Sequence, residues 1–398
     1  MNQFPFGIDF VLGVDCPDTK RYKSNRSSQA DYDCPFCHHK RKFHVDHAKG
    51  VYRCNACGES GGMLKLHQSL RGLPDTKVAY ADLLRIWNST SEEDKKSTYA
   101  VKYSASDATE TKATIIDVRD KVYKNLLGYL SLSEEHKNDL LRRGLSEEQI
   151  VKGNYKSLPA VGFCTLAEIS LWKSVNIPDF QDAMKYWQAV FKNGSVIPGM
   201  YRVNDSIRIV RRSNKSISGY FVPVKDCYGR ISGMQIRYDN LPENATEKQI
   251  ENYHKYAWYS SSEKETGCPV TGIENVHHTF TVDGAAPKTV YLTEGCLKAD
   301  IASAISGKPF IALIGVNNVS QLPQELKYLK ENGTQLIKVA VDMDYRDKPN
   351  VAKALANIMQ IIGEAGLESV LLTWPSEYKG IDDFLAEDAR RKKKNSRS

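Results

Sequence analysis

The sequence lacks the long apolar run that a membrane-spanning helix requires. No stretch of the 398 residues approaches the roughly 18 consecutive apolar residues of such a helix. Residues 1–13 contain neither the basic segment nor the apolar segment of a secretory signal. These absences predict a cytoplasmic protein with no membrane partner. A G-x-x-x-x-G-K-S/T motif is also missing, which excludes a P-loop motor.

A disulfide framework is not indicated either, although the chain has nine cysteines. An odd number of cysteines, five of them scattered, does not suggest systematic pairing and is compatible with a reducing compartment. The remaining cysteines form two knuckles with the spacing C-x2-C-x16-C-x2-C, namely Cys34, Cys37, Cys54 and Cys57.

This spacing predicts a bound zinc ion. Zn²⁺ prefers four tetrahedral ligands, and two knuckles supply two thiolates each. Because the protein would fill all four positions, the zinc would be structural rather than catalytic. Nearby histidines either substitute for one ligand or lie on the surface of a basic loop: His38, His39, His44 and His47. In the same ribbon, Lys40, Arg41 and Lys42 precede Phe43, a combination that can contact single-stranded DNA by charge and stacking.

Positive charge is concentrated in two places. The formal net charge is +7, and six positive charges belong to the C-terminal residues 390–397, which leaves +1 for the rest. Residues 201–239 carry eight Arg or Lys and three Asp. Such a segment either follows nucleic-acid phosphates or is a solvated surface. The tail 389–398 is expected to be disordered, and either holds DNA or a partner weakly or aids solubility.

Composition and periodicity predict several domains. Residues 1–87 form the zinc ribbon, with a strand at 52–54 and a helix at 63–71. Residues 88–114 are polar and predict a flexible linker with at most a short strand at 99–103. Residues 115–286 are helical at first, with N-caps at Ser133 and Ser146, and then mixed. Within them, 219–224 and 231–238 predict a β-hairpin.

Residues 287–388 alternate between apolar strands and helices. We expect strands at 289–292, 310–314, 336–341 and 369–374, each followed by a helix, at 297–306, 321–331, 351–364 and 381–387. This alternation is typical of a parallel sheet covered on both faces. The fold class is therefore multidomain α+β and α/β.

Acidic residues follow two of these strands. Glu294 precedes Gly295 at the end of the first strand, and Asp342 and Asp344 end the third. Ligands bind outside the carboxyl ends of parallel strands, and residues i and i+2 of a strand share a face. Carboxylates there can hold Mg²⁺ with waters and substrate phosphates, while Glu294 acts as base or further ligand. Asp382 and Asp383 add an acidic edge. Taken alone, each of these two acidic motifs also occurs commonly in ordinary turns.

The order of these motifs resembles a DnaG-type primase of a bacterium, phage or mobile element. Thr293-Glu294-Gly295 and Asp342-Met343-Asp344 are similar to the glutamate and D-x-D motifs of the TOPRIM domain, a Rossmann-like metal-binding fold. The ribbon segment 52–62 is close to the primase pattern, although that family usually has His at the position of Cys37. The 292–300 stretch resembles variant TOPRIM domains of phage and mobile-element replication proteins.

The segment between the ribbon and the acidic motifs also resembles the primase core. The hairpin 221–237 looks like part of its N-terminal subdomain, and 255–261 is similar to the motif that follows it. The resemblance implies that catalysis depends on Glu294, Asp342 and Asp344, with Mg²⁺ or Mn²⁺ as the ion. It also implies candidates for substrate or DNA contacts: Lys225, Arg230, Arg237, Lys255 and Lys298.

The implied activity is the synthesis of short RNA primers from NTPs on a single-stranded DNA template. A separate replicative helicase is implied as partner, because no helicase motor is present. Two alternatives stay open, namely a TOPRIM metal-dependent nuclease and a non-enzymatic zinc-ribbon DNA-binding protein of replication or recombination. A topoisomerase would need a catalytic tyrosine in a large additional domain, which nothing here supplies.

Overall fold

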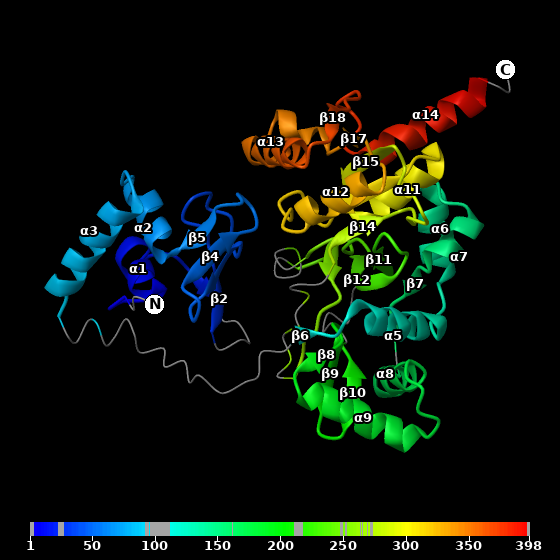
Figure 1. Cartoon of the computed structure of the whole chain (residues 1–398), viewed down its shortest axis with the longest axis horizontal. Coiled ribbons are helices and arrows are strands. Elements are labelled where there is room, and N and C mark those ends of the chain that lie inside the picture. The colour runs from blue at the N-terminus through cyan, green and yellow to red at the C-terminus, as the bar shows by residue number, and fades with distance from the viewer. Residues whose placement is uncertain are drawn as a thin grey trace. The chain divides into compact units, whose positions relative to one another are not determined.

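The computed structural model divides into two compact units, Met1–Ala108 and Thr109–Ser398. Figure 1 shows the elements of both units, which are described separately below. None of the helices described here is long and apolar enough to cross a membrane. The structure describes residues 4–22, 28–91, 95, 112–160, 162–210, 218–246, 250, 253–262, 264, 266–268, 270 and 274–395.

The first unit is an antiparallel sheet with three helices. The sheet has the order β1-β2-β3-β4-β5. Its strands are β1 (Arg21–Tyr22), β2 (Gln29–Tyr32), β3 (Phe43–Asp46), β4 (Val51–Cys54) and β5 (Ser60–Gly62), and the helices are α1 (Ile8–Asp15), α2 (Met63–Arg71) and α3 (Thr76–Ser89). The predicted strand 52–54 and helix 63–71 are confirmed.

Helix α2 is bounded by two glycines and buries one side. It starts after Gly62 and stops at Gly72, whose left-handed backbone suits glycine. Leu66 and His67 lie on the buried side of this helix, as the apolar spacing predicts. Helix α3 begins at the Asp75 cap and continues to Ser89, so it enters the predicted linker by two residues. The possible strand at 99–103 lies outside the described residues.

The second unit begins with helices and short strands. Ser133 caps α6, and Ser146 forms a capping box on α7, as predicted. These elements are β6 (Lys112–Ala113), α5 (Ile116–Gly128), α6 (Glu134–Arg142), α7 (Glu147–Gly153), β7 (Lys156–Ser157), α8 (Phe163–Trp172), α9 (Phe180–Lys192), β8 (Ser195–Val196), β9 (Met200–Val203) and β10 (Ser206–Ile209). Strand β6 lies inside the stretch 88–114 that was expected to be a linker, and it pairs with β8.

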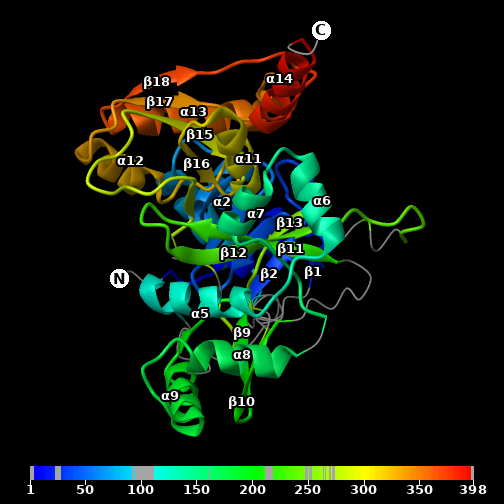
Figure 2. The same cartoon turned by 90° about the vertical axis from the view of Figure 1, so that its right-hand side faces the viewer.

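The predicted hairpin forms the centre of a second sheet. Strands β11 (Gly219–Lys225) and β12 (Ile231–Tyr238) pair antiparallel, in the order β13-β12-β11-β7 with β13 (Tyr256–Trp258). Asp226 closes the turn by accepting the backbone N–H groups of Tyr228 and Arg230. Figure 2 shows this sheet between the parallel sheet above it and helices α5, α8 and α9 below.

The last part is the parallel sheet that the alternating pattern predicts. Its order is β14-β16-β15-β17-β18, with β14 antiparallel and the other strands parallel. The antiparallel edge strand β14 was not predicted. The elements are β14 (Val276–His278), β15 (Thr289–Glu294), α11 (Cys296–Ser306), β16 (Phe310–Leu313), α12 (Leu322–Glu331), β17 (Leu336–Val339), η1 (Met343–Arg346), α13 (Pro349–Glu364), β18 (Glu368–Leu371) and α14 (Ile381–Asn395).

Alternate residues of the strands face opposite helix layers. Ile311 of β16 packs with α12 and α13, whereas Phe310 and Ala312 pack with α11. Both faces are therefore covered, which explains why the strands are apolar throughout. Helix α14 lies beside α11 in both views (Figures 1 and 2).

The predicted end of the last helix at residue 387 is wrong. Helix α14 continues to Asn395, into the tail that we expected to be disordered. Ion pairs one turn apart stabilise the extension, because Glu387 contacts Arg391 and Asp388 contacts Lys392. These pairs were not predicted because their carboxylates, Glu387 and Asp388, come before the tail 389–398, whose composition alone was considered.

Candidate functional site

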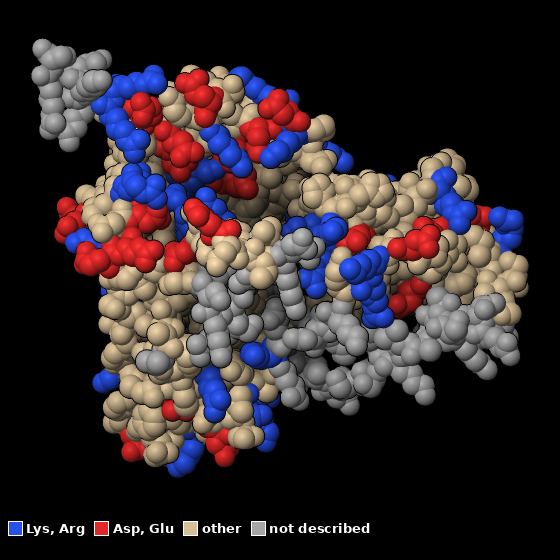
Figure 3. All heavy atoms as spheres, turned by 180° about the vertical axis from the view of Figure 1, so that it is seen from behind, with Lys and Arg blue, Asp and Glu red and all other residues tan. Residues whose placement is uncertain are grey.

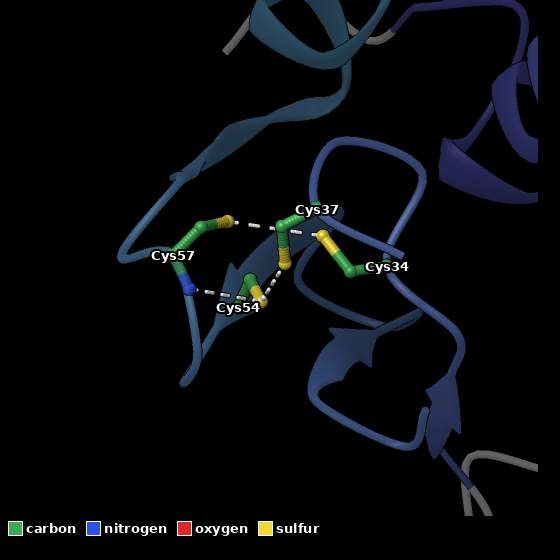
Figure 4. Close-up of side chains that lie close together, drawn as sticks. All are labelled: Cys34, Cys37, Cys54 and Cys57. Carbon is green, nitrogen blue, oxygen red and sulfur yellow. Dashed lines mark hydrogen bonds between the residues drawn. The ribbon is translucent and has the colours of Figure 1, made fainter. Parts of the chain in front are cut away.

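The four knuckle cysteines converge on one point in the first unit. Their Sγ atoms all lie within 4.8 Å of one another. The Cys34–Cys57 and Cys37–Cys54 sulfur atoms are each 3.8 Å apart. Zn–S bonds of about 2.3 Å in a tetrahedron separate neighbouring sulfurs by about 3.8 Å. The geometry therefore fits zinc, and Figure 4 shows the thiols directed toward one another.

The histidines near the zinc site have other partners or point elsewhere. His44 lies 2.5 Å from Asp31, and buried His47 lies 2.6 Å from Asp9. His38 and His39 are exposed. None of these four belongs to the group that can hold a metal among the described residues. Among the described residues the candidate ligand set therefore consists of the four cysteines. His47 is buried and is not the surface histidine that the sequence suggested.

The ribbon does not offer Phe43 for base stacking. Its ring is fully buried and packs 5.0 Å from the ring of Tyr52. The expectation that this aromatic contacts DNA is wrong, because the ring belongs to the core of a very small domain. The basic residues beside it, Lys40 and Arg41, are exposed, and Arg41 lies over the ring of Tyr22 at 4.4 Å.

In the second unit, carboxylates gather at one edge of the parallel sheet. We call Glu294, Asp342, Asp344, Asp382 and Asp383 the acidic cluster. Glu294 is the last residue of β15, and Gly295 turns the chain into α11 with a φ of 85°, which favours glycine. Asp382 and Asp383 lie in the first turn of α14. The cluster is thus drawn from strand, loop and helix.

The predicted placement of Asp342 and Asp344 on a strand is wrong. Strand β17 ends at Val339, and Asp342 precedes the 3₁₀ helix η1, to which Asp344 belongs. After Ala340 pairs with Leu292, the next backbone bond joins Met343 to Lys379, outside the sheet. The two carboxylates are therefore brought near Glu294 by a tight turn rather than by alternation along a strand.

Lysines balance the charge of the acidic cluster. Lys298 of α11 is ion-paired with Asp342, and Lys379 lies 3.7 Å from both Asp342 and Asp344. Lys348 lies 2.7 Å from Asp344. Burial opposes ionisation of Asp344, but Lys348, Lys379 and Lys298 hold its pKa below the ordinary value. Burial raises the pKa of Glu294. The charge of Lys298 lowers this pKa and that of Asp342 raises it, and the net shift is upward.

The acidic cluster suits a hard divalent cation. Mg²⁺ is commonly held by one or two carboxylates, with waters and phosphates completing its octahedron. Asp342 and Asp344 supply two such groups. Within the described part of the chain, however, only the cysteines bring three or more ligand atoms together. The carboxylates do not converge as closely, and Lys298 lies against one of them.

Three predicted contact residues are engaged inside the protein. Arg230 is held by Asp226 and Asp117. Lys225 is half-buried and donates to the carbonyl of Lys152, and burial lowers its pKa. Arg237 is buried, with Asp139 at 4.0 Å. These positions tie the hairpin to its neighbours, so their charge is less accessible than the sequence suggested.

A second charged group borders the acidic cluster. We call Arg143, Arg237 and Lys255 the cationic cluster. Asp139 balances part of it, 2.9 Å from Arg143. Burial, followed by the charges of Arg237 and Arg143, lowers the pKa of Lys255. Three cations around one carboxylate leave an excess of positive charge, which favours an anionic ligand.

The two clusters influence each other electrostatically. The charge of Asp383 acts on Lys255, and those of Asp382 and Lys298 act on Tyr256, the next residue. Sequence reasoning missed Arg143 and Tyr256, because only the fold brings α6 and β13 to this edge. Figure 3 shows acidic and basic side chains gathered around a hollow in the upper part of the view.

The basic segment 201–239 carries a separate pocket. A cavity of about 410 Å³ is lined by Tyr201, Arg202, Val203, Asn204, Lys264 and Thr266. The Lys264 ammonium lies 5.3 Å from the centre of the Tyr201 ring. The pocket combines a cation with an aromatic face, but its residues belong to β9 and the loop before residue 268 rather than to the acidic cluster.

Comparisons with known proteins found one family model and several solved structures that are similar to this chain. Residues 285–392 match a family model described as a domain of unknown function, DUF3854. No curated protein matches the chain. Among solved structures, the zinc-binding and RNA polymerase domains of the Aquifex aeolicus primase are 17% identical, with a TM-score of 0.45, over 96% of this chain and 81% of that one.

Two further structures are of the same kind. A DnaG primase catalytic domain bound to single-stranded DNA is 16% identical, with a TM-score of 0.44, and covers 70% of this chain and 77% of its own. The primase fragment of the bacteriophage T7 primase-helicase protein is 11% identical, with a TM-score of 0.35, over 90% and 95%. These solved structures of primases are similar to the chain at 11–17% identity.

Proposed function

We propose that this chain is a DNA primase that synthesises short RNA primers from NTPs on a single-stranded DNA template. The observation that carries the proposal is the electrostatic coupling of the two clusters, in which carboxylates suited to a divalent ion act on a group of cations suited to phosphates. Nucleotidyl transfer needs this combination, because a triphosphate arrives with its metal and leaves as pyrophosphate.

Each side chain of the acidic cluster has a role in this proposal. Asp342 and Asp344 hold the Mg²⁺ or Mn²⁺, with Asp382 and Asp383 at the edge of its coordination sphere. When bound, the ion orients the triphosphate and stabilises the developing charge. Glu294 has a pKa that burial raises, which suits it to accept the proton of the attacking 3′-hydroxyl.

The cationic cluster and the zinc ribbon handle the anionic partners. Lys255 is exposed beside two arginines, so a phosphate that binds there relieves repulsion between like charges. Lys40 and Arg41 of the ribbon are exposed and would contact the template backbone. The zinc is structural in this proposal, since four thiolates leave no open position for catalysis.

The larger assignments follow from the same proposal. The parallel sheet, predicted at 287–388, is a TOPRIM domain, and 115–286 is the N-terminal subdomain of the primase core. The protein serves DNA replication of a bacterium, phage or mobile element, and a separate replicative helicase works with it. The neighbouring T7 protein is by its description a primase-helicase, which supports such a pairing.

A primer-synthesis assay tests the proposal. It combines single-stranded DNA, four NTPs of which one is labelled, and Mg²⁺ or Mn²⁺, with wild type, Asp342→Ala and the control Asp182→Ala on the exposed side of α9. Short RNA from wild type and the control, and at least about 100-fold less from Asp342→Ala, is the expected result.

Two outcomes contradict the proposal. Metal-dependent cleavage of the DNA without RNA synthesis would identify a nuclease. DNA binding with neither reaction, also when a helicase is supplied, and unchanged by Asp342→Ala, would identify a binding protein.

A further inference from the structure

The acidic cluster contains one internal cation. The Lys298 Nζ lies against Asp342 Oδ1, and the two side chains are only 18% and 11% exposed. Two other lysines contact the carboxylates of the acidic cluster, and their side chains are more exposed: Lys348 is 59% and Lys379 is 65% exposed. Solvent screens those two strongly, whereas the Lys298–Asp342 pair is held at short range in a poorly hydrated position.

Lys298 is surrounded by carboxylates from three further elements. Burial would lower its pKa, but Asp342, Asp382 and Glu294 raise it above the ordinary value. A Cβ built on Gly380 would lie 3.3 Å from Lys298 Nζ and would overlap Asp382 Oδ1. The ammonium and this carboxylate oxygen therefore face the same point. Asp382 Oδ1 is buried and has no hydrogen-bond partner within the described residues.

The position of Lys298 conflicts with a metal on the same oxygen. A divalent ion held by Oδ1 of Asp342 needs the lone pair that now faces the ammonium. Two cations cannot share this oxygen at short range, because their repulsion grows as the site loses water. The ion pair must open before or while the metal enters.

We propose that Lys298 is an exchangeable counter-cation of the metal site. Without metal it neutralises Asp342 and keeps the acidic cluster folded, and a divalent cation displaces it. The released ammonium then binds the phosphates of a nucleoside triphosphate at that metal. A lysine suits this exchange, since its flexible four-carbon stem carries three donors. The inference rests on the proposed function, because it requires the metal and the nucleotide at this site.

Mn²⁺ binding measured by electron paramagnetic resonance tests the exchange. We compare zinc-loaded wild type with Lys298→Met, which keeps the length of the side chain and removes its charge. Without nucleotide, Lys298→Met should bind Mn²⁺ on the order of 10-fold more tightly, since one competing charge is gone. With a non-hydrolysable NTP, the Mn²⁺–nucleotide complex should bind the variant several-fold more weakly.

Two further variants separate charge from packing. Lys348→Met removes a solvent-screened lysine that also contacts the cluster, and should change Mn²⁺ affinity by less than about twofold. Lys298→Arg keeps the charge and should bind Mn²⁺ as weakly as wild type. Lys298→Gln replaces Lys298→Met if thermal unfolding shows that the methionine variant is not folded.

The outcomes distinguish this inference from the proposed function. Unchanged or weaker Mn²⁺ binding by a folded Lys298→Met, with normal binding by wild type, overturns the exchange and leaves the proposed metal site intact. No Mn²⁺ binding by either protein overturns both. Binding by Lys298→Met alone supports the exchange, since it means that the lysine excludes the metal at the concentration used.

Discussion

The Nε2 atom of His277 lies 3.1 Å from Oδ1 of Asp300, which joins strand β14 to helix α11. The backbone N–H of Lys225 donates to the other ring nitrogen of His277, so the proton on Nε2 points at the carboxylate. The Tyr155 hydroxyl donates to the second oxygen of Asp300. The side chains of His277 and Tyr155 thereby fix α11 through Asp300, and this helix begins two residues after Glu294.

We predict that Asp300→Asn destabilises the second unit by about 2–4 kcal/mol. The amide has one acceptor oxygen for two donors, so one buried hydrogen bond is lost and one donor is left facing the amide N–H₂. Urea unfolding followed by circular dichroism measures the change. The control is Asp182→Asn, an exposed carboxylate that pairs with Lys185 and should change stability by less than about 0.5 kcal/mol. Equal stability of both variants would contradict the role of Asp300.

The same substitution has a predictable dependence on pH. Burial opposes ionisation of Asp300, but His277 and Lys225 outweigh it and hold its pKa below the ordinary value. A lowered pKa in the folded state means that the stabilisation is present above the ordinary pKa of about 4 and is lost as the pH falls through the folded value. The difference between wild type and Asp300→Asn should therefore shrink only below about pH 4.

Asp382 should produce the opposite pH dependence in the absence of divalent metal. Burial raises its pKa to about 6. The folded protein then holds this proton more tightly than the unfolded chain does. The contribution of Asp382 to the free energy of unfolding is therefore greatest below about pH 4 and falls as the pH rises through 6. We expect wild type to lose roughly 2–3 kcal/mol over this range relative to Asp382→Asn, which cannot ionise. Parallel unfolding curves for the two proteins between these pH values would refute the prediction.

The zinc site should tolerate histidine at one of its positions. Cys37 is partly buried and supplies one of the four thiolates, and imidazole nitrogen is an equally suitable ligand. We expect Cys37→His to retain one zinc ion per chain and Cys37→Ser to lose it. Because binding of a structural zinc contributes about 10–16 kcal/mol in small domains, loss of the metal should unfold the ribbon. Metal analysis and circular dichroism measure both effects, and a folded ribbon in a zinc-free Cys37→Ser protein would contradict them.

Local signals located some of the helices and strands, but not the side chains that these elements bring together. Gly62 and Gly72 mark the ends of α2, and Ser133 and Ser146 mark the starts of their helices, because caps act over a few residues. Strand β14 was missed, since three residues are too few to show a period. The parallel sheet and its two helical layers followed from the alternating pattern, whereas the order of its strands was not predicted.

The side-chain partners at the site could not be predicted in the same way. Lys298 and Asp342 are 44 residues apart, and no spacing rule connects them. Asp342 and Asp344 follow strand β17, but they lie on a turn rather than on the strand, and this placement depends on the long-range bond between Met343 and Lys379. Arg237 is a charged residue in a basic segment, and only packing shows that it is buried.

Lys255 should contribute to DNA binding through its charge. Its side chain is exposed, and partial desolvation of the ammonium, followed by the charges of Arg237 and Arg143, lowers its pKa. Replacement by Ala removes one phosphate contact, so affinity for single-stranded DNA should fall and the slope of log K against log salt should decrease by about 0.7. Fluorescence anisotropy at several salt concentrations measures the slope. Lys185→Ala, on exposed α9, should leave it unchanged, and an unaltered slope for both variants would exclude a phosphate contact at Lys255.

A tightly packed glycine position of the second unit, Gly199, should be intolerant of any side chain. Gly199 has a φ of +86°, a region that costs other residues about 1–2 kcal/mol. An added Cβ would also overlap the buried ring of Tyr259, which packs 4.9 Å from Phe221 and cannot easily move. We therefore expect Gly199→Ala to lower the free energy of unfolding by roughly 3–5 kcal/mol. Gly307→Ala separates the two causes, because its φ is +66° but no atom lies within 4 Å of the new Cβ. That control should lose only about 1 kcal/mol, and equal losses in urea unfolding would show that backbone conformation alone, not the Tyr259 ring, limits position 199.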